Sequence, residues 1–346
     1  MPAIGLDISD SAVSVVELVR RGNAYAIGRF GRRPLPPGAI SGGYVNDKDS
    51  VVTELRRLRD ELSLDFVNAS LSEEKAYLFK TSIPVVPRKE IRSVLEFKLE
   101  ENLPIPAAEA IFDYAVILGE AHRPQDHLDV SVTVLPHKVV DTYNELIVSA
   151  GLRPLSFEIE AQAISRSVVK RGDRTTSLVV NFGETKTGLF IVSDEVVHFT
   201  STVALGGANI TDVIAKYLSI SRAEAEAIKH ERAKLVDRKN MDLFFSLMNA
   251  ISALKDEVNK LSVYWNTHKE PAAAEGPRKI ERIILTGRDA GLSGFDDYLS
   301  LALHLPVTVG NVWCNTCAFD DYIPPIGFEE SLDYAAAVGL ALPKGH

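Results

Sequence analysis

The sequence contains very little cysteine and no long apolar run. Cys314 and Cys317 are the only cysteines among its 346 residues, which excludes the disulfide framework of a small secreted protein and suits a reducing compartment. No apolar stretch approaches the roughly 20 residues that a membrane-spanning helix needs. Because Met1 leads directly into a predicted strand, we expect no signal peptide. These absences predict a cytoplasmic protein.

Positive charge is also scarce. The chain has 38 Lys and Arg residues against 47 Asp and Glu residues, which gives a formal net charge of -9. A nucleic-acid partner needs a clustered basic face, and an anionic membrane surface repels an acidic protein. We therefore expect no nucleic-acid partner and no direct membrane insertion.

Several common catalytic signatures are missing as well. The sequence has no G-x-S-x-G, no G-x-x-x-x-G-K-[ST] and no H-E-x-x-H, so it lacks the marks of serine hydrolases, P-loop nucleotidases and zincin proteases. The WCNTC segment from Trp313 to Cys317 imitates a redox dithiol. One cysteine pair supplies only two zinc ligands, however, and no thioredoxin-like unit surrounds it. We expect the pair to be structural.

What the sequence does contain is one pattern that occurs twice. With 46% hydrophobic and 25% charged residues the chain has the composition of a globular protein of about two domains. Residues 3–62 and 177–218 each predict a strand, a tight polar turn, a strand, a hairpin, a strand and a helix. Backbone amides of both turns would then project from rigid sheets toward a common space. Two such turns facing each other can cradle a triphosphate.

Apolar periodicity places the other elements. We expect the segment from Phe157 to Asp173 to be a helix. Further helices are predicted at about 49–62, 87–101, 137–150, 221–232 and 240–265, and further strands near 66–71, 76–82, 111–118 and 128–135.

The composition changes after about residue 82, where an insert begins. The predicted division has a first lobe of residues 1–82, 152–175 and 334–346, an inserted subdomain of residues 83–151, and a second lobe of residues 176–333. The mixture of strands and helices in each part indicates an α/β protein with a small α+β insert.

The order of these motifs resembles the actin-like ATPase superfamily, in which two ribonuclease-H-like lobes hold ATP in the cleft between them. The resemblance covers almost the whole chain and implies that fold, with the insert in the first lobe. It also implies four groups of nucleotide contacts. These are Asp7, Ser9, Asp10 and Ser11 in the first turn; Asn181, Gly183, Glu184, Thr185, Lys186 and Thr187 in the second turn; Gly206, Gly207, Asn209, Glu226 and Lys229 in a bend and helix pair; and Gly287, Arg288 and Asp289 in an adenosine loop.

The resemblance implies ATP or ADP with Mg²⁺ as cofactors, and Asp7 as the residue near the metal. Asn181 departs from the superfamily pattern, which has an aspartate at this position. Losing one charge at roughly 6 Å with an effective dielectric of about 20 removes about 3 kcal/mol of attraction to a cation before screening. We therefore expect nucleotide binding with weak or absent hydrolysis.

Several long stretches resemble the type IV pilus assembly PilM family in the same order, among them LDISDSAVSVVEL, SAGLRPLSFEIEAQAISR and ALKDEVNKLSVYW. Members of that family resemble adaptors that capture the N-terminal peptide of a PilN-like inner-membrane protein, alongside other pilus components. The resemblance implies that this partner recruits the protein to the inner membrane. The peptide would bind between the first lobe and the insert, at Leu95, Leu103 and Ile105.

Two alternatives stay open. A sugar-kinase-like phosphotransferase on the same fold would need an acid in the cleft to deprotonate a hydroxyl, and Asp10 and Glu184 are the candidates. An FtsA-like cell-division protein would need an amphipathic membrane-anchoring helix after the last helix, where this sequence reads LALPKGH. We expect no such anchor.

Overall fold

The computed structural model describes residues 3–117, 127–230, 241–267, 279–292, 294–318 and 322–344. Residues 231 and 232 of the helix predicted at 221–232 lie outside these ranges. Residue 240, the first of the helix predicted at 240–265, also lies outside them. Within the ranges, no helix is long and apolar enough to cross a membrane.

Two five-stranded sheets share one topology. In each sheet, three consecutive strands form an antiparallel meander and two later strands add in parallel beside the first strand of that meander. The first sheet has the order β10-β6-β1-β2-β3, and the second has the order β13-β12-β11-β14-β15. The strands are β1 (Ala3–Ile8), β2 (Ala12–Arg21), β3 (Ala24–Pro34), β6 (Phe66–Leu71), β10 (Arg153–Ile159), β11 (Ser177–Phe182), β12 (Thr187–Ser193), β13 (Val196–Val203), β14 (Arg282–Thr286) and β15 (Val307–Val309).

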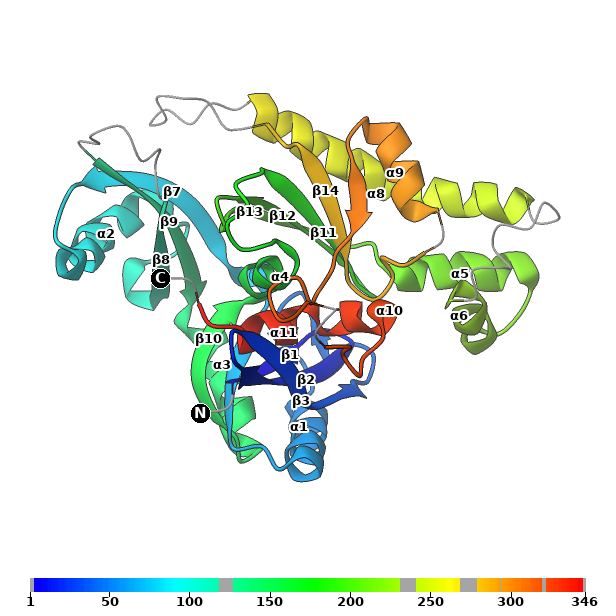
Figure 1. Cartoon of the computed structure of the whole chain (residues 1–346), viewed down its shortest axis with the longest axis horizontal. Helices are drawn as coiled ribbons and strands as arrows, with labels where there is room; N and C mark the ends of the chain where they lie inside the picture. The colour runs from blue at the N-terminus through cyan, green and yellow to red at the C-terminus, as the bar shows by residue number, and fades with distance from the viewer. Residues whose placement is uncertain are drawn as a thin grey trace.

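The meanders confirm the repeated pattern predicted from the sequence. β1 and β11 are nearly continuous apolar runs, buried along most of their length, as expected for central strands covered on both faces. Each strand ends in a short polar turn, and Figure 1 shows the two sheets in adjacent parts of the molecule with α4 and α11 between them.

Helices cover the sheets. Asp47 caps the first helix by accepting a hydrogen bond from the Ser50 amide at 3.0 Å, and Val51, Leu55 and Leu58 bury one face of it. The helices are α1 (Lys48–Leu62), α2 (Arg88–Asn102), α3 (His137–Ser149), α4 (Glu160–Val168), α5 (Gly207–Leu218), α6 (Arg222–His230), α8 (Met241–Thr267), α9 (Phe295–Leu303), α10 (Phe328–Ser331) and α11 (Ala335–Ala341), with short 3₁₀ turns η1 (Glu73–Lys75), η2 (Ala107–Glu109) and η4 (Leu332–Tyr334) and the small hairpin β4 (Ile40–Ser41) and β5 (Tyr44–Val45).

One predicted helix begins too early. The segment expected to be helical from Phe157 is strand β10 up to Ile159, and α4 starts only at Glu160. Leu155, Phe157 and Ile159 recur at every second position, which is the period of a strand, and β10 pairs in parallel with β6 from end to end. The prediction of helix was therefore wrong over residues 157–159, and also over residues 169–173, because α4 ends at Val168.

A third sheet stands apart from the first two. It has the order β7-β9-β8, with β7 (Tyr77–Pro84), β8 (Ala110–Ile117) and β9 (His127–Pro136). Helix α2 packs on it and encloses a separate apolar core, and Figure 1 places this unit at one end of the molecule. The strand expected at 76–82 thus pairs with the insert, and α3 packs on α1 and β10 of the first lobe. The division at residues 83 and 151 stays a prediction.

Helices α4 and α11 cross at very short range. A Cβ atom added to Gly339 of α11 would lie 1.7 Å from the carbonyl oxygen of Ala163 in α4, and the Arg166 guanidinium donates to the Gly339 carbonyl at 2.7 Å. A Cβ on Gly5 of β1 would lie 1.9 Å from the Ala337 oxygen. Small residues at this crossing therefore allow the two backbones to approach closely.

Candidate functional site

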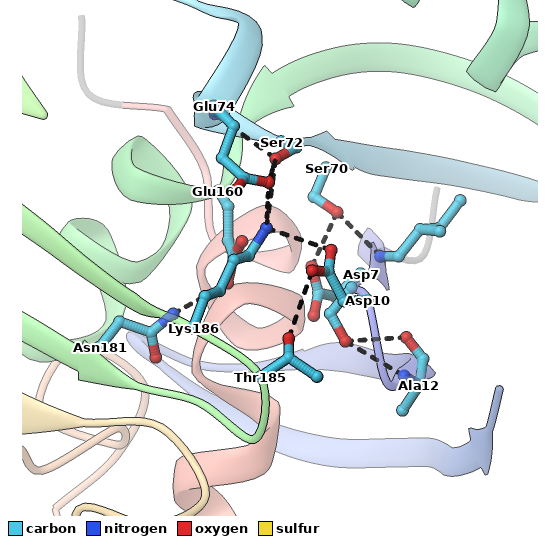
Figure 2. Close-up of polar contacts among 12 residues, drawn as sticks. Asp7, Asp10, Ala12, Ser70, Ser72, Glu74, Glu160, Asn181, Thr185 and Lys186 are labelled. Atoms are coloured by element: carbon cyan, nitrogen blue, oxygen red, sulfur yellow. Dashed lines mark hydrogen bonds and ion pairs between the residues drawn. The ribbon is translucent and has the colours of Figure 1, made fainter. Parts of the chain in front are cut away.

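The two polar turns face each other across a cleft. In the first turn, Ser9 uses its side chain locally, since its hydroxyl donates to the Ala12 carbonyl at 3.0 Å. From the second turn, the Thr185 hydroxyl donates to Asp10 at 3.3 Å and Lys186 Nζ lies 3.1 Å from the same carboxylate. Figure 2 shows Thr185 and Lys186 of the second turn pointing toward Asp10 of the first turn. The turns therefore meet as the sequence predicted.

Most of the predicted nucleotide contacts line this cleft. From the first turn come Asp7, Ser9, Asp10 and Ser11; from the second come Asn181, Gly183, Glu184, Thr185 and Lys186; and from the adenosine loop come Gly287 and Arg288. Gly287 has a φ of 90°, and a Cβ there would lie 2.6 Å from Asn181 Oδ1. Only glycine suits this position.

The residues of the Gly-Gly bend lie behind the second turn. The Gly207 amide donates to the Gly183 carbonyl at 2.9 Å, and the Thr187 hydroxyl donates to the Leu205 carbonyl at 2.6 Å. Asn209 accepts a hydrogen bond from the Gly206 amide at 2.9 Å and so caps α5. Their contacts hold the shape of the turn, and they do not line the cleft.

A buried ion cluster joins α6 to the adenosine loop. Lys229 Nζ lies 2.7 Å from Asp289 and 3.0 Å from Glu226, and the side chains of Lys229 and Asp289 are fully buried. Arg288 lies 3.7 Å from Glu226. Gly207 packs against Asp289, where a Cβ would lie 1.7 Å from its carboxylate. Arg288 lines the cleft, whereas Lys229, Asp289 and Glu226 are not among its lining residues.

Lys186 is the central cation of the cleft. Its ammonium lies 2.6 Å from Glu74 and 3.1 Å from Asp10, so it joins the second lobe to two segments of the first. Its side chain is 14% exposed. Although burial alone lowers a lysine pKa, the surrounding carboxylates Glu73, Asp10, Glu160 and Glu74 raise the pKa of Lys186. Lys186 is therefore positively charged at any physiological pH.

Two buried carboxyl groups of the cleft were not anticipated from the sequence. Glu160 begins α4 and accepts a hydrogen bond from the Asn181 amide at 2.9 Å. Burial, with Glu73 and Asp7 nearby, raises the pKa of Glu160 well above its ordinary value, and burial also raises the pKa of Glu73. Glu160 lies in the segment from Phe157 to Asp173 that was predicted to be a helix, but that prediction alone did not direct it to the cleft. Glu73 had no signal either, since SEEK reads as an ordinary polar turn.

Asp7 is buried beneath the first turn. Burial raises its pKa to about 6, and the hydrogen bond from the Ser70 hydroxyl, at 2.7 Å, and the charges of Lys186 and Arg32 limit the rise. A carboxyl pKa raised in the folded state gives stability that is complete below about pH 3.8 and is lost as pH rises through about 6.

Replacing Asp7 with asparagine should therefore stabilise the protein at neutral and alkaline pH. The variant keeps the shape and the acceptor for Ser70, so at pH 8 its free energy of unfolding should exceed that of the wild type by up to about 3 kcal/mol, falling toward no difference near pH 4. Urea unfolding across this range measures it, with the exposed Asp49→Asn as a control. A difference that does not change with pH would contradict the buried, ionised state of Asp7.

The residues around Asp7 do not fit a protein-ligated magnesium ion. Among the described residues, no group of three or more His, Cys, Asp or Glu side chains is placed to hold a metal. The Asn181 amide nitrogen is directed to Glu160, and the Lys186 ammonium lies among the carboxylates, where it repels a second cation. The magnesium expected beside Asp7 thus lacks the carboxylate of the superfamily pattern at position 181, and it would lie close to the Lys186 ammonium.

A family comparison decides what kind of protein has this cleft. The family described as "Type IV pilus assembly protein PilM" matches residues 5–344. The chain belongs to the PilM family. Its structure is also similar to that of the "PilM-PilN type IV pilus biogenesis complex", with 22% identity, a TM-score of 0.78, and coverage of 99% of this chain and 98% of that one.

Two further solved structures share the fold of this PilM-family chain. The ethanolamine utilization protein EutJ from Carboxydothermus hydrogenoformans is 14% identical over 99% of this chain and 89% of its own, with a TM-score of 0.59. MreB5 of Spiroplasma citri, solved bound to ADP, is 16% identical over 91% of this chain and 93% of its own, with a TM-score of 0.54. The predicted actin-like fold is confirmed.

The three residues predicted to contact the partner peptide differ in their burial. Leu95 is fully buried in the core of the three-stranded sheet, among Ile91, Leu99 and Val132. A side chain at this spacing on α2 faces the sheet and not the surface, so we do not include Leu95 in the proposed peptide site. Leu103 and Ile105 are half-buried.

Proposed function

We propose that this PilM-family protein binds ATP or ADP between its two lobes and serves as a cytoplasmic adaptor of a type IV pilus or related secretion machine. The observation that carries the nucleotide proposal is the meeting of two polar turns, one from each sheet, across one cleft. Turns of this kind present backbone amides to anions. The ADP-bound MreB5 structure has the same fold and supports the choice of ligand.

In this proposal, each part of the cleft has its own role. The turns at Ser9–Ser11 and Gly183–Thr185 would bind the phosphates, and Arg288 would stack on the base, as guanidinium groups do on aromatic rings. We expect slow hydrolysis or none. Magnesium has no step in this account, because the residues around Asp7 do not fit it.

The adaptor role needs a partner surface, and a groove lies among residues 108–145, within the predicted insert. It has a volume of about 640 Å³ and is lined by η2, the end of β9 and the exposed face of α3. Its lining is acidic, because it has three carboxylates, on Glu109, Asp141 and Glu145, against the single lysine Lys138. Cytoplasmic segments next to a membrane span are rich in Lys and Arg. The groove therefore suits the N-terminal segment of a PilN-like inner-membrane protein, with Leu103 and Ile105 just before η2 as apolar contacts.

This partner proposal predicts a charge-dependent complex. A synthetic peptide with the N-terminal sequence of a PilN-like protein should bind the wild type, and Asp141→Lys should weaken that binding at least about tenfold. Asp141 is exposed on α3, so the protein should fold normally. Fluorescence anisotropy measures the affinity.

Glu100→Lys is the matched control, since it makes the same charge change on the exposed face of α2, away from the groove. It should leave the affinity within about twofold of the wild type. Equal weakening by both variants would reduce the effect to net charge, and no weakening by Asp141→Lys would move the peptide elsewhere.

The phosphotransferase alternative has less support. Asp10, one of its two candidate acids beside Glu184, is engaged by Lys186 and Thr185. A substrate hydroxyl would have to displace these contacts before it could reach the Asp10 carboxylate. We therefore prefer the adaptor.

A further inference from the structure

We propose that the Lys186 ammonium supplies, within the cleft, the positive charge that a divalent cation supplies in most nucleotide sites, so that this chain binds ATP or ADP with little dependence on Mg²⁺. The inference rests on the proposed nucleotide binding and names the residue that makes the site electrostatically possible. It would make Lys186 a determinant of which form of the nucleotide, free or metal-bound, the protein takes.

The position of Lys186 is the first argument. Lys186 belongs to the second turn, immediately after the residues proposed to bind phosphate, and it reaches across to the first lobe. Its ammonium meets Asp10, Glu74 and the Ser72 hydroxyl at 3.1, 2.6 and 3.4 Å, as Figure 2 shows. A cation held between two carboxylates at the floor of a phosphate cleft occupies the kind of place where Mg²⁺ is found, bound by one or two carboxylates and by phosphates.

The charge balance of the cleft is the second argument. Seven acidic residues lie in or beside it: Asp7, Asp10, Glu73, Glu160, Glu184 and Asp333 line it, and Glu74 lies beside it on Lys186. Lys186, Arg32 and Arg288 are the cations that line the described part of the cleft. A polyphosphate entering among these carboxylates would be repelled without a close positive charge. Lys186 is the cation that contacts the acids directly.

The hydrogen bonds of Lys186 leave room for a phosphate. An ammonium group has three donors, and the contact with Ser72, at 3.4 Å, is the longest of its three. A phosphate oxygen can replace this neutral hydroxyl while the ion pairs with Glu74 and Asp10 remain. The ammonium would then bridge phosphate and carboxylates, as a metal ion does.

Asn181 gives the third argument. A carboxylate at this position would add a metal ligand, but the Asn181 amide donates to Glu160 instead. The donor set therefore favours a fixed ammonium over a bound divalent ion.

Isothermal titration with ADP and with ATP, in buffer containing either Mg²⁺ or EDTA, tests the inference. The wild type should bind in both buffers with affinities within about threefold of each other. Lys186→Met should lose at least about tenfold in EDTA and recover part of the loss in Mg²⁺, whereas Lys186→Arg, which keeps the charge, should stay closer to the wild type. Lys80→Met is the matched control, because Lys80 is another half-buried lysine, 3.3 Å from Asp129 and remote from the cleft.

The outcomes separate the two proposals. Wild-type affinity that falls more than about tenfold in EDTA would overturn this inference and leave nucleotide binding intact. Unchanged affinity of a folded Lys186→Met variant in EDTA would also overturn it. Absence of wild-type binding in both buffers would instead overturn the proposed function. If Lys186→Met does not fold, the wild-type comparison between the two buffers still decides.

Discussion

Replacing Gly339 with alanine should destabilise the whole protein by about 3 kcal/mol or more, a cost at the upper end for overpacked cores. The new methyl group would lie 1.7 Å from the carbonyl oxygen of Ala163 and 2.4 Å from its carbon. Both atoms belong to the backbone of α4, so a side-chain rotation cannot relieve the clash. α11 and α4 would have to separate, and the cleft above them would lose its floor, to which Ala335 and Ala336 contribute.

Urea unfolding followed by circular dichroism measures this effect. Gly291→Ala is the control, because a Cβ at Gly291 meets no atom within 4 Å; its free energy of unfolding should change by less than about 0.5 kcal/mol. Similar midpoints for Gly339→Ala and the wild type would contradict the close helix crossing.

Replacing Leu95 with aspartate should unfold the inserted sheet, at a cost of about 4 kcal/mol or more. Leu95 is fully buried among the apolar residues that join α2 to the three-stranded sheet. The substitution removes that contact and buries a carboxylate with no partner. Hydrogen exchange along β7, β8 and β9 should rise sharply, and the thermal unfolding transition should shift or split.

Phe97→Asp is the control for this substitution. Phe97 lies two residues further along the same helix but is 82% exposed, so its replacement should change stability by less than about 1 kcal/mol. Equal destabilisation by the two variants would contradict the orientation of α2. The comparison also separates a core residue from a surface residue, which the sequence pattern at Leu95 did not do.

Much of the fold could be predicted because each sheet is locally encoded. The apolar runs of β1, β2, β11 and β12 and the polar turns between them are adjacent in sequence, so their pairing needs no long-range information. β10 is different. Its alternating apolar residues run directly into the apolar positions of α4, so periodicity does not place the boundary between strand and helix. The pairing of β10 with β6, which extends to Ile159, sets that boundary.

The candidate site was predictable to a similar degree. The turns were found through their local pattern, whereas Glu73 reaches the cleft only because η1 follows β6 directly, on the same side as the first turn. Thr187 and Asn209 are polar and close in sequence to the second turn, so they were predicted to contact the nucleotide. Their side chains instead form hydrogen bonds with the backbone of Leu205 and Gly206. Sequence spacing places a polar residue near a site but does not tell whether the backbone has already taken its hydrogen bonds.

The most direct test of the account is nucleotide binding at the facing turns. Titration calorimetry should detect ADP or ATP binding to the wild type, and Thr185→Glu should reduce the affinity at least about tenfold, because it adds a negative charge where the phosphates would lie. Thr185 is exposed, so folding should be unaffected. Thr53→Glu makes the same change on the exposed face of α1 and should have no effect. Binding that Thr185→Glu leaves unchanged, or no binding by the wild type, would contradict the account.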